Sequence, residues 1–172
     1  MQQRPTGRFL IQSALLFVIG TTVVLTAHHF QGQTDPAFPT RVCDLHFSSG
    51  QVLAGVPVAE TPAQRAKGLS KRNDVGLGML FTWERSEPQM FWMRDTWVPL
   101  TIGFFDDGGR LFSIQDMQPN SDDLYESIQP VANALELPHG DFQRYGLQEG
   151  EYLTKHNCTK LSQVPNQQHE AS

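Results

Sequence analysis

The sequence predicts a mainly β domain of the β-rich α+β class, with one or two short helices. Aromatic residues make up 10% of the chain, including 11 Phe, and they accompany 14 Gly and 11 Pro. Aromatic residues favour strands and Gly and Pro favour turns, so this composition indicates short strands joined by tight turns. A length of 172 residues allows one such domain once a leader and a tail are set aside.

Residues 1–30 predict an export signal or a membrane anchor. Arg4 and Arg8 precede residues 9–27, which carry no charge. A basic start followed by an apolar run is typical of a secretory signal peptide. The run is also long enough to span a bilayer, so a cleaved signal and a retained anchor both stay open. We therefore expect a protein of the periplasm or cell envelope, with a polar linker at residues 31–40.

The region 41–158 alternates apolar and polar residues in the manner of a β domain. We expect strands at residues 42–47, 51–59, 76–83, 90–95, 100–105, 110–116, 131–137 and 146–154. Thr61 and Pro62 predict the start of a short helix, because Thr is a good N-cap and Pro suits the first helical position. Gln64 completes a capping box, and Gly68 stands near the end of the helix.

The connections are also marked in the sequence. Residues 106–109, Asp-Asp-Gly-Gly, predict a hairpin turn with positive φ at one or both glycines. Residues 119–130 predict a polar loop, and residues 141–145 predict one short helical turn. The aromatic stretch 91–106 predicts the central strand pair of the domain, and the polar residues 159–172 predict a disordered tail.

Cysteines and charge narrow the class of protein. Cys43 and Cys158 bracket the predicted domain, which favours a disulfide between its first and last strands in an exported protein. The net charge is -5, and without Arg4 and Arg8 the chain has 11 basic and 18 acidic residues. This balance disfavours nucleic-acid binding, which usually needs a basic face. Neither the histidines nor the methionines have the spacing of metal ligands, so we predict no metal and no other cofactor.

Short motifs within residues 56–154 resemble those of the DUF192 family, a bacterial and archaeal domain of unknown function. The matching motifs are Gly78-Met79-Leu80-Phe81, Phe91-Trp92-Met93-Arg94 with Thr96, Pro99-Leu100, Leu135-Glu136-Leu137, Gly140 and Gly146-Leu147. The resemblance implies a compact, mainly antiparallel β-sandwich or barrel-like body. It implies no settled activity.

Polar residues embedded in otherwise apolar or glycine-rich segments are the main candidate ligand-binding residues. They are Arg65, Arg72, Arg94, Asp95 and Thr96, and the aromatic Trp97 is a further candidate. A buried guanidinium needs a partner, so the arginines predict either an internal network or a cleft that grips a carboxylate, phosphate or sugar oxygen. The three tryptophans at positions 83, 92 and 97, with Phe91, could form a stacking platform for sugar rings, although core packing is favoured for most of them. Trp97 lies between predicted strands and is the best candidate for an exposed ring.

Three hypotheses for the function follow. The first is an exported, non-enzymatic module that binds a small anionic ligand, a glycan or an envelope protein in a cleft walled by these arginines and Trp97. The second is a hydrolase or transferase acting on envelope polymers, with Asp95 as acid or base and Asp106 or Glu136 as second carboxylate. The third is a structural or assembly module without a cleft. The sequence contains no G-x-S-x-G nucleophile motif.

Overall fold

The computed structural model describes residues 37–161. The predicted signal or anchor at residues 1–30, most of the predicted linker and residues 162–172 of the predicted tail lie outside the described range. Within residues 37–161, no helix is long and apolar enough to cross a membrane.

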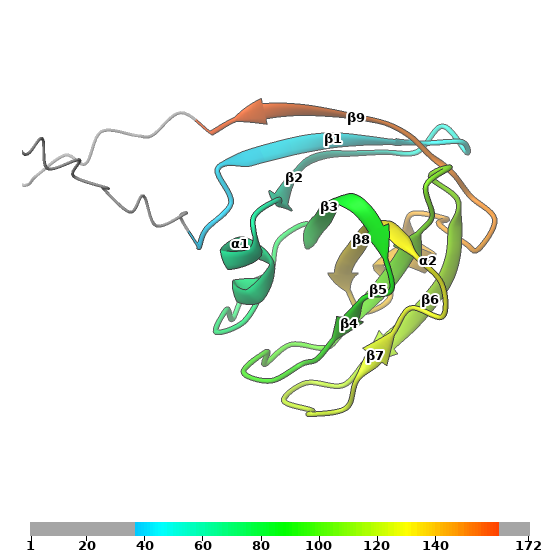
Figure 1. The fold of residues 1–172 in the computed structure, drawn as a ribbon. Helices are drawn as coiled ribbons and strands as arrows, with labels where there is room; N and C mark the ends of the chain where they lie inside the picture. The colour runs from blue at the N-terminus through cyan, green and yellow to red at the C-terminus, as the bar shows by residue number, and fades with distance from the viewer. Residues whose placement is uncertain (1–36, 162–172) are drawn as a thin grey trace, which may run out of the picture. The chain divides into compact units, whose positions relative to one another are not determined.

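The described chain consists mainly of short strands and has two short helices, as the composition predicts (Figure 1). The elements are β1 (Arg41–Phe47), β2 (Val52–Ala59), α1 (Pro62–Lys67), β3 (Met79–Glu87), β4 (Met90–Phe91), β5 (Leu100–Phe105), β6 (Leu111–Met117), β7 (Tyr125–Glu126), β8 (Val131–Pro138), α2 (Asp141–Arg144) and β9 (Leu153–Lys160). The β-rich fold class is therefore confirmed.

Within the described residues, seven strands form one sheet in the order β6-β5-β8-β3-β2-β1-β9, and β4 and β7 form a separate pair. Neighbouring strands are antiparallel except β2 and β3, which run parallel. Parallel neighbours cannot be joined by a hairpin, so the chain crosses over through α1. The sheet is thus mixed, and it forms no closed barrel. Figure 1 shows the β4–β7 pair at the end of the domain away from β1 and β9.

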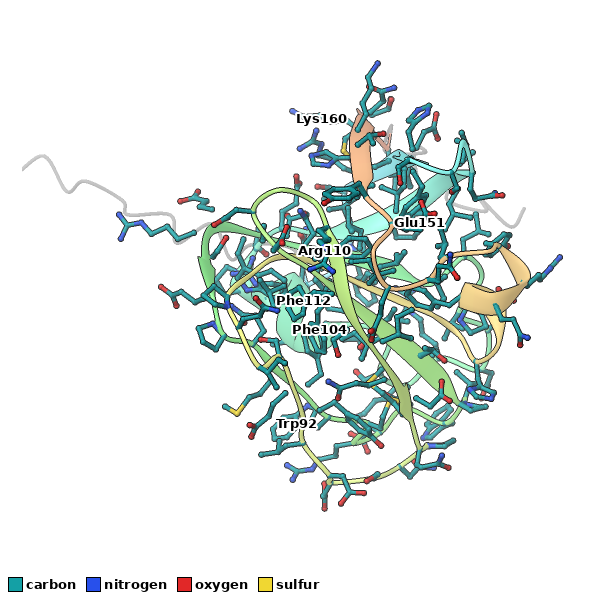
Figure 2. All side chains as sticks on the ribbon, turned by 90° about the vertical axis from the view of Figure 1, so that its right-hand side faces the viewer. Trp92, Phe104, Arg110, Phe112, Glu151 and Lys160 are labelled. Carbon is teal, nitrogen blue, oxygen red and sulfur yellow. A yellow bond between two sulfur atoms is a disulfide. The ribbon has the colours of Figure 1, made fainter. Side chains whose placement is uncertain are left out.

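The sheet curls until its two ends meet at one corner. The turn between β5 and β6 contacts the segment before β9 through an isolated bridge between Arg110 and Tyr152. The Leu111 N–H donates to the Glu151 carbonyl, and the Leu153 N–H donates to the Gly109 carbonyl, each at 2.8 Å. Figure 2 shows Arg110 and Glu151 near one another at this corner. The curled sheet has buried side chains on both of its faces.

Two hydrophobic clusters occupy the two faces. In β3, Met79 and Phe81 belong to one cluster and Leu80 belongs to the other, because successive strand residues point to opposite faces. Leu69, from the loop after α1, covers the Met79 face. Phe142 of α2 covers the Leu80 face. Each face of the sheet is therefore covered by a different helical segment.

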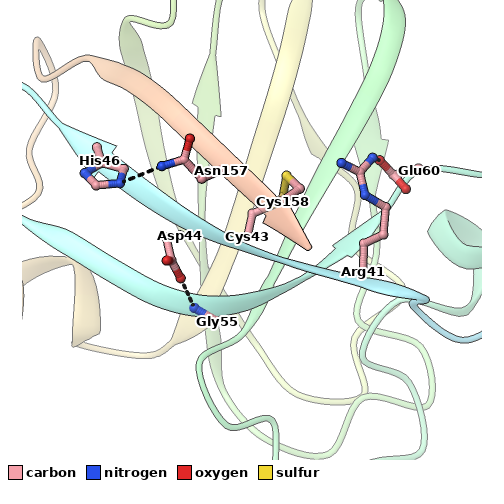
Figure 3. Close-up of a disulfide and its surroundings, with 8 residues drawn as sticks. All are labelled: Arg41, Cys43, Asp44, His46, Gly55, Glu60, Asn157 and Cys158. Atoms are coloured by element: carbon pink, nitrogen blue, oxygen red, sulfur yellow. Dashed lines mark hydrogen bonds and ion pairs between the residues drawn. A yellow bond between two sulfur atoms is a disulfide. The ribbon is translucent and has the colours of Figure 1, made fainter. Parts of the chain in front are cut away.

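A disulfide joins the first and last strands, as predicted. Cys43 of β1 lies directly opposite Cys158 of β9, with their Cα atoms 4.0 Å apart (Figure 3). The bond closes a chain segment with a sequence separation of 115. Near it, the Asp44 carboxylate accepts a hydrogen bond at 2.8 Å from the Gly55 N–H, at a point where the β1–β2 register shifts.

Local signals for the helix start and the hairpin are confirmed. Thr61 accepts from the Gln64 N–H, and the Gln64 side chain accepts from the Thr61 N–H, which together form the predicted capping box. The turn between β5 and β6 has φ +78° at Gly109. A Cβ at Gly109 would lie 2.5 Å from the Leu153 carbonyl oxygen, so this glycine also permits the close approach of the two ends of the sheet.

Three predicted strands are wrong in extent. The strand predicted at 76–83 begins only at Met79, because Gly76 and Gly78 have positive φ and form a turn. The strand predicted at 90–95 ends at Phe91, since Asp95 has φ +56° and the Thr96 N–H turns back to the Met93 carbonyl.

The last strand also differs from the prediction at 146–154. Gly146 and Gly150 have positive φ in turns, and β9 runs instead from Leu153 to Lys160. The predicted tail therefore starts too early, because residues 159 and 160 are part of β9. The aromatic stretch 91–106 is not the central pair either: β8 and β3 lie nearer the centre of the sheet, and β4 belongs to the small sheet.

Candidate functional site

Several predicted site residues gather around one cavity of about 290 Å³ on the Met79 face of the sheet. The loop after α1 forms one wall, β4 and the loop that follows it form another, and β3 and β8 form the base. We call it the cationic cavity, lined by Arg65, Ala66, Lys67, Gly68, Leu69, Ser70, Phe81, Trp83, Gln89, Met90, Phe91, Trp92, Arg94, Thr96 and Glu136. Its lining combines three basic side chains with four aromatic rings.

Glu136 of β8 is the most unusual residue of this cavity. It lies opposite Met79 of β3 and Ile102 of β5, both fully buried, and is itself only 5% exposed. Burial raises the pKa of the Glu136 carboxyl to about 8. Within the described range its carboxyl takes part in no hydrogen bond or ion pair, and no fully buried polar side-chain atom there lacks a partner. Its oxygens must therefore be open to the cavity.

A glycine allows the backbone around Glu136 to pack closely. Gly78 has φ +74°, and a Cβ on it would lie 1.8 Å from the Glu136 carbonyl oxygen. No other residue can make this approach without moving β3 away from β8. The Gly78-Met79 motif and the Leu135-Glu136-Leu137 motif are thus two sides of one contact.

Arg65 is held mainly by backbone carbonyls. Its guanidinium donates to the carbonyl of Glu60 and, at 2.9 Å, to the carbonyl of Thr82, and it lies 5.5 Å from the centre of the Trp83 ring. Burial lowers the pKa of Arg65, and Glu84 partly opposes this effect. Arg65 therefore connects α1 to β3, which agrees with the internal network that the sequence predicts as one alternative. The Arg65 side chain also lines the cavity.

Arg94 lies at the solvent side of the same cavity. Its Nε donates to Asp122 at 2.7 Å, and its guanidinium lies 4.4 Å from the centre of the Trp92 ring. The side chains of Arg94 and Asp122 are 55% and 72% exposed. Arg94 is thus not buried against an internal carboxylate, and its guanidinium remains accessible to a ligand.

The other predicted site residues divide into two groups. Thr96 lines the cavity and is buried. Arg72, Asp95 and Trp97 do not line it. Asp95 is exposed and lies 3.6 Å from the Lys71 ammonium.

The exposed ring at the cavity is Trp92, where the sequence favoured Trp97. Both residues are about half exposed, so Trp97 is exposed as expected and Trp92 is not packed in the core. Trp92 stands between Phe91 and Met93, whose side chains pack into the core, and its own side chain points outward. Figure 2 shows Trp92 far from Lys160, at the end of the domain where β4 lies.

The pair of carboxylates required by the enzyme hypothesis does not come together here. Glu136 is the only carboxylate among the described residues that line the cationic cavity. Asp95 faces solvent, and Asp106 lies in the β5–β6 turn, where it accepts the N–H groups of Gly108 and Arg110. The cavity therefore offers one protonatable group and several cations.

Fold and cavity together define a small β-rich domain with a cavity lined by basic and aromatic side chains. The model of the DUF192 family, described as an uncharacterized ACR, matches residues 46–155. The chain therefore belongs to the DUF192 family, as its motifs predict.

Two solved structures are similar to the chain. One is a proposed transcription regulator from Sinorhizobium meliloti 1021, with 28% identity, a TM-score of 0.61, and coverage of 74% of this chain and 98% of that one. Another is a protein of unknown function from Novosphingobium aromaticivorans DSM 12444, with 30% identity, a TM-score of 0.58, and coverage of 64% and 81%. No curated protein matches the sequence.

Proposed function

We propose that the protein is an exported module that binds a small anionic ligand carrying a ring or several hydroxyl groups in the cationic cavity. The observation that carries this proposal is the Glu136 carboxyl, which opens to the base of a cavity whose other charged lining residues are Arg65, Lys67 and Arg94. Burial raises the pKa of this carboxyl to about 8 and so keeps it protonated at neutral pH. The cavity therefore presents one neutral acid and three cations to a ligand.

The cavity suits a ligand with two different ends. At the solvent side, Arg94 is exposed and its planar guanidinium can bind a carboxylate or phosphate. At the base, Glu136 has a pKa of about 8 and is protonated at neutral pH, so it can both donate and accept a hydrogen bond. The half-exposed Trp92 ring also lines the cavity. A sugar acid has the required anionic group, hydroxyls and flat faces.

Export is part of the proposal and is supported by two features. The uncharged run at residues 9–27 after Arg4 and Arg8 has the pattern of a signal or anchor. The Cys43–Cys158 disulfide is typical of a protein that folds in an oxidising compartment. The periplasm or cell envelope meets both conditions.

The other hypotheses are less well supported. A hydrolase or transferase that uses paired carboxylates lacks the second carboxylate in this cavity. A purely structural module would not need an open cavity lined by three basic side chains. Transcription regulation, the role in the description of the Sinorhizobium protein, is not proposed for this chain, because its net charge of -5 disfavours nucleic acid as a partner.

A thermal-shift titration of the full chain tests the proposal. Glucuronate and glucose form a matched pair of probes that differ in one carboxylate. We expect glucuronate to raise the melting temperature and glucose to raise it less, because a ligand that binds the folded state stabilises it. Equal shifts with both sugars would contradict a role for the anionic group, and no shift with any sugar acid or organic phosphate would overturn the proposal.

Variants locate the binding. Arg94→Gln should weaken the glucuronate response, and Glu136→Leu should weaken it by removing both the donor and the acceptor at the base. Arg144→Gln is the matched control, because Arg144 is exposed, pairs with Asp141 and lines no part of this cavity. A response that survives Arg94→Gln unchanged would show that binding occurs elsewhere.

A further inference from the structure

The opposite face of the sheet carries a larger cavity, of about 660 Å³, with a different chemistry. It lies between the β5–β6 hairpin and the segment from His139 through α2 to Glu149. We call it the acidic cavity, lined by Thr101, Ile114, Asp116, His139, Gly140, Phe142, Gln143, Gly146, Leu147, Gln148 and Glu149. Among these described residues there is no Lys or Arg.

Three polar side chains form a connected group at its edge. Thr101 and Asp116 are cross-strand neighbours on β5 and β6, and the Thr101 hydroxyl donates to the Asp116 carboxylate at 2.6 Å. His139 follows β8, and its Nδ1 lies 3.2 Å from the same carboxylate oxygen and 3.4 Å from the Thr101 oxygen. The backbone N–H of His139 donates to the Pro99 carbonyl at 3.1 Å, which fixes the start of this segment.

This geometry assigns the proton of the neutral imidazole. Both neighbours of Nδ1 are oxygens that can accept, because the Thr101 hydrogen is already directed to Asp116. Nδ1 of His139 therefore carries the hydrogen, and Nε2 keeps its lone pair. The carboxylate orients the ring in the way that carboxylates orient histidines in binding and catalytic sites. The result is a fixed hydrogen-bond acceptor at a half-exposed position.

The remaining lining favours a neutral ligand. Gln143 and Gln148 offer amides that both donate and accept, and the Glu149 carboxylate already accepts from the Ile114 N–H at 3.1 Å. Apolar surface from Phe142 and Leu147 lies beside these groups. An anion would meet carboxylates without a compensating cation, whereas hydroxyl groups match both the acceptors and the amides. No group of three metal-ligating side chains comes together within the described residues.

We propose that the acidic cavity is a second binding site, for a neutral polyhydroxylated ligand such as a saccharide, and that a ligand hydroxyl donates to Nε2 of His139. The site is distinct from the cationic cavity, on the other face of the sheet, and does not depend on what that cavity binds. Asp116 and Thr101 act as positioning residues, since they contact the imidazole and hold its orientation.

Titration of the isotope-labelled full chain, followed through backbone amide resonances, tests this site. The neutral probes are methyl glucoside and N-acetylglucosamine, and acetate and methylammonium serve as charged probes. We expect the neutral probes to shift the amides of Gly140 and Gly146, which line the acidic cavity and do not line the cationic one. The proposal is overturned if neither neutral sugar shifts these amides, or if acetate or methylammonium shifts them as strongly.

Two histidine variants identify the acceptor. His139→Ala should weaken the binding of the neutral probe about fivefold, the effect of one hydrogen bond of ~1 kcal/mol. His156→Ala is the matched control, because His156 is exposed on β9 and does not line this cavity. His139→Ala should leave the melting temperature nearly unchanged, since its side chain is 54% exposed. Equal affinity of His139→Ala and the unchanged chain would refute the role of Nε2.

Discussion

The cationic and acidic cavities lie on opposite faces of one sheet, and they differ in the burial and hydrogen bonding of their carboxyl groups. Consecutive strand residues separate them: Thr101 points to the acidic cavity, whereas Ile102 lies opposite Glu136 on the cationic side. Glu136 is only 5% exposed and takes part in no hydrogen bond with another residue of the range 37–161, whereas the Asp116 side chain is 60% exposed and accepts from two neighbours. The comparison shows that burial and hydrogen bonding, and not residue type, decide what a carboxyl can do.

The largest expected effect comes from Glu136. Its pKa is near 4.5 unfolded and about 8 folded, so between these values the folded protein keeps a proton that the unfolded chain has released. Its stability contribution is complete below about pH 4.5 and is lost as the pH rises through about 8. At ~1.4 kcal/mol per pH unit the loss is on the order of 5 kcal/mol.

Denaturant unfolding at pH 5 and pH 8 measures this loss. We expect the stability of the unchanged chain to fall between the two pH values and that of Glu136→Gln to fall much less, because the amide cannot ionise. Asp116→Asn is the control in the other cavity, where an exposed pair contributes at most ~1 kcal/mol. Parallel pH profiles for the unchanged chain and Glu136→Gln would show that the acid is not buried as described.

Reduction of the Cys43–Cys158 disulfide should lower the stability of the whole domain, and so of both cavities, by the same amount at low and high pH. The bond constrains a loop with a sequence separation of 115, and loss of a bond closing so long a loop costs up to about 4.7 kcal/mol in the chain-entropy model. We expect dithiothreitol to lower the free energy of unfolding by about this amount at both pH values. The Cys43→Ala/Cys158→Ala variant should not respond to the reductant. A change confined to pH 8 would mean that the disulfide is coupled to Glu136.

Substitution of one glycine beside each cavity tests how tightly the backbone is packed there. Gly78→Ala adds a Cβ that meets the Glu136 carbonyl oxygen, whereas a Cβ at Gly140, beside the acidic cavity, meets nothing within 4 Å. Both have positive φ, so each substitution costs about 1 to 2 kcal/mol of backbone strain. The additional clash should bring Gly78→Ala to about 3 kcal/mol or more. Equal melting temperatures for the two variants would show that β3 and β8 separate easily at Glu136.

Signals that act over a few residues predicted the fold best. The capping box of Thr61 and Gln64 and the positive φ of Gly109 depend on neighbours in sequence, and both are present. The strand predicted over residues 90–95 failed because distant contacts decide its course. The Met93 N–H donates to the Ser121 carbonyl, and the Asn120 N–H donates to the Thr96 carbonyl. Apolar composition alone cannot indicate such bonds.

The same limit applies to the sites. Arg65, Arg94 and Thr96 could be selected because each stands in an aromatic or glycine-rich motif, and all three line one cavity. The sequence indicates Glu136 only as a possible second carboxylate, because an acid between two leucines fits a strand with one solvated face. Its burial comes from the loop after α1 and from the segment around Met93, which cover that face. The group of Asp116 and His139 depends on strand register across three strands, which the sequence does not display.

The smallest stability effect is expected at Arg94, where the largest effect on ligand binding is expected. A buried arginine paired with an internal acid would cost about 3 to 5 kcal/mol when removed. Arg94 and Asp122 are both exposed, so their ion pair and the stacking on Trp92 should together contribute no more than about 1 kcal/mol. The free energy of unfolding of Arg94→Ala should therefore lie within about 1 kcal/mol of that of Arg144→Ala, an exposed control. Glucuronate should stabilise the Arg144→Ala control but not Arg94→Ala. Loss of several kcal/mol on Arg94→Ala would instead show that the walls of the cationic cavity depend on this side chain for their own folding.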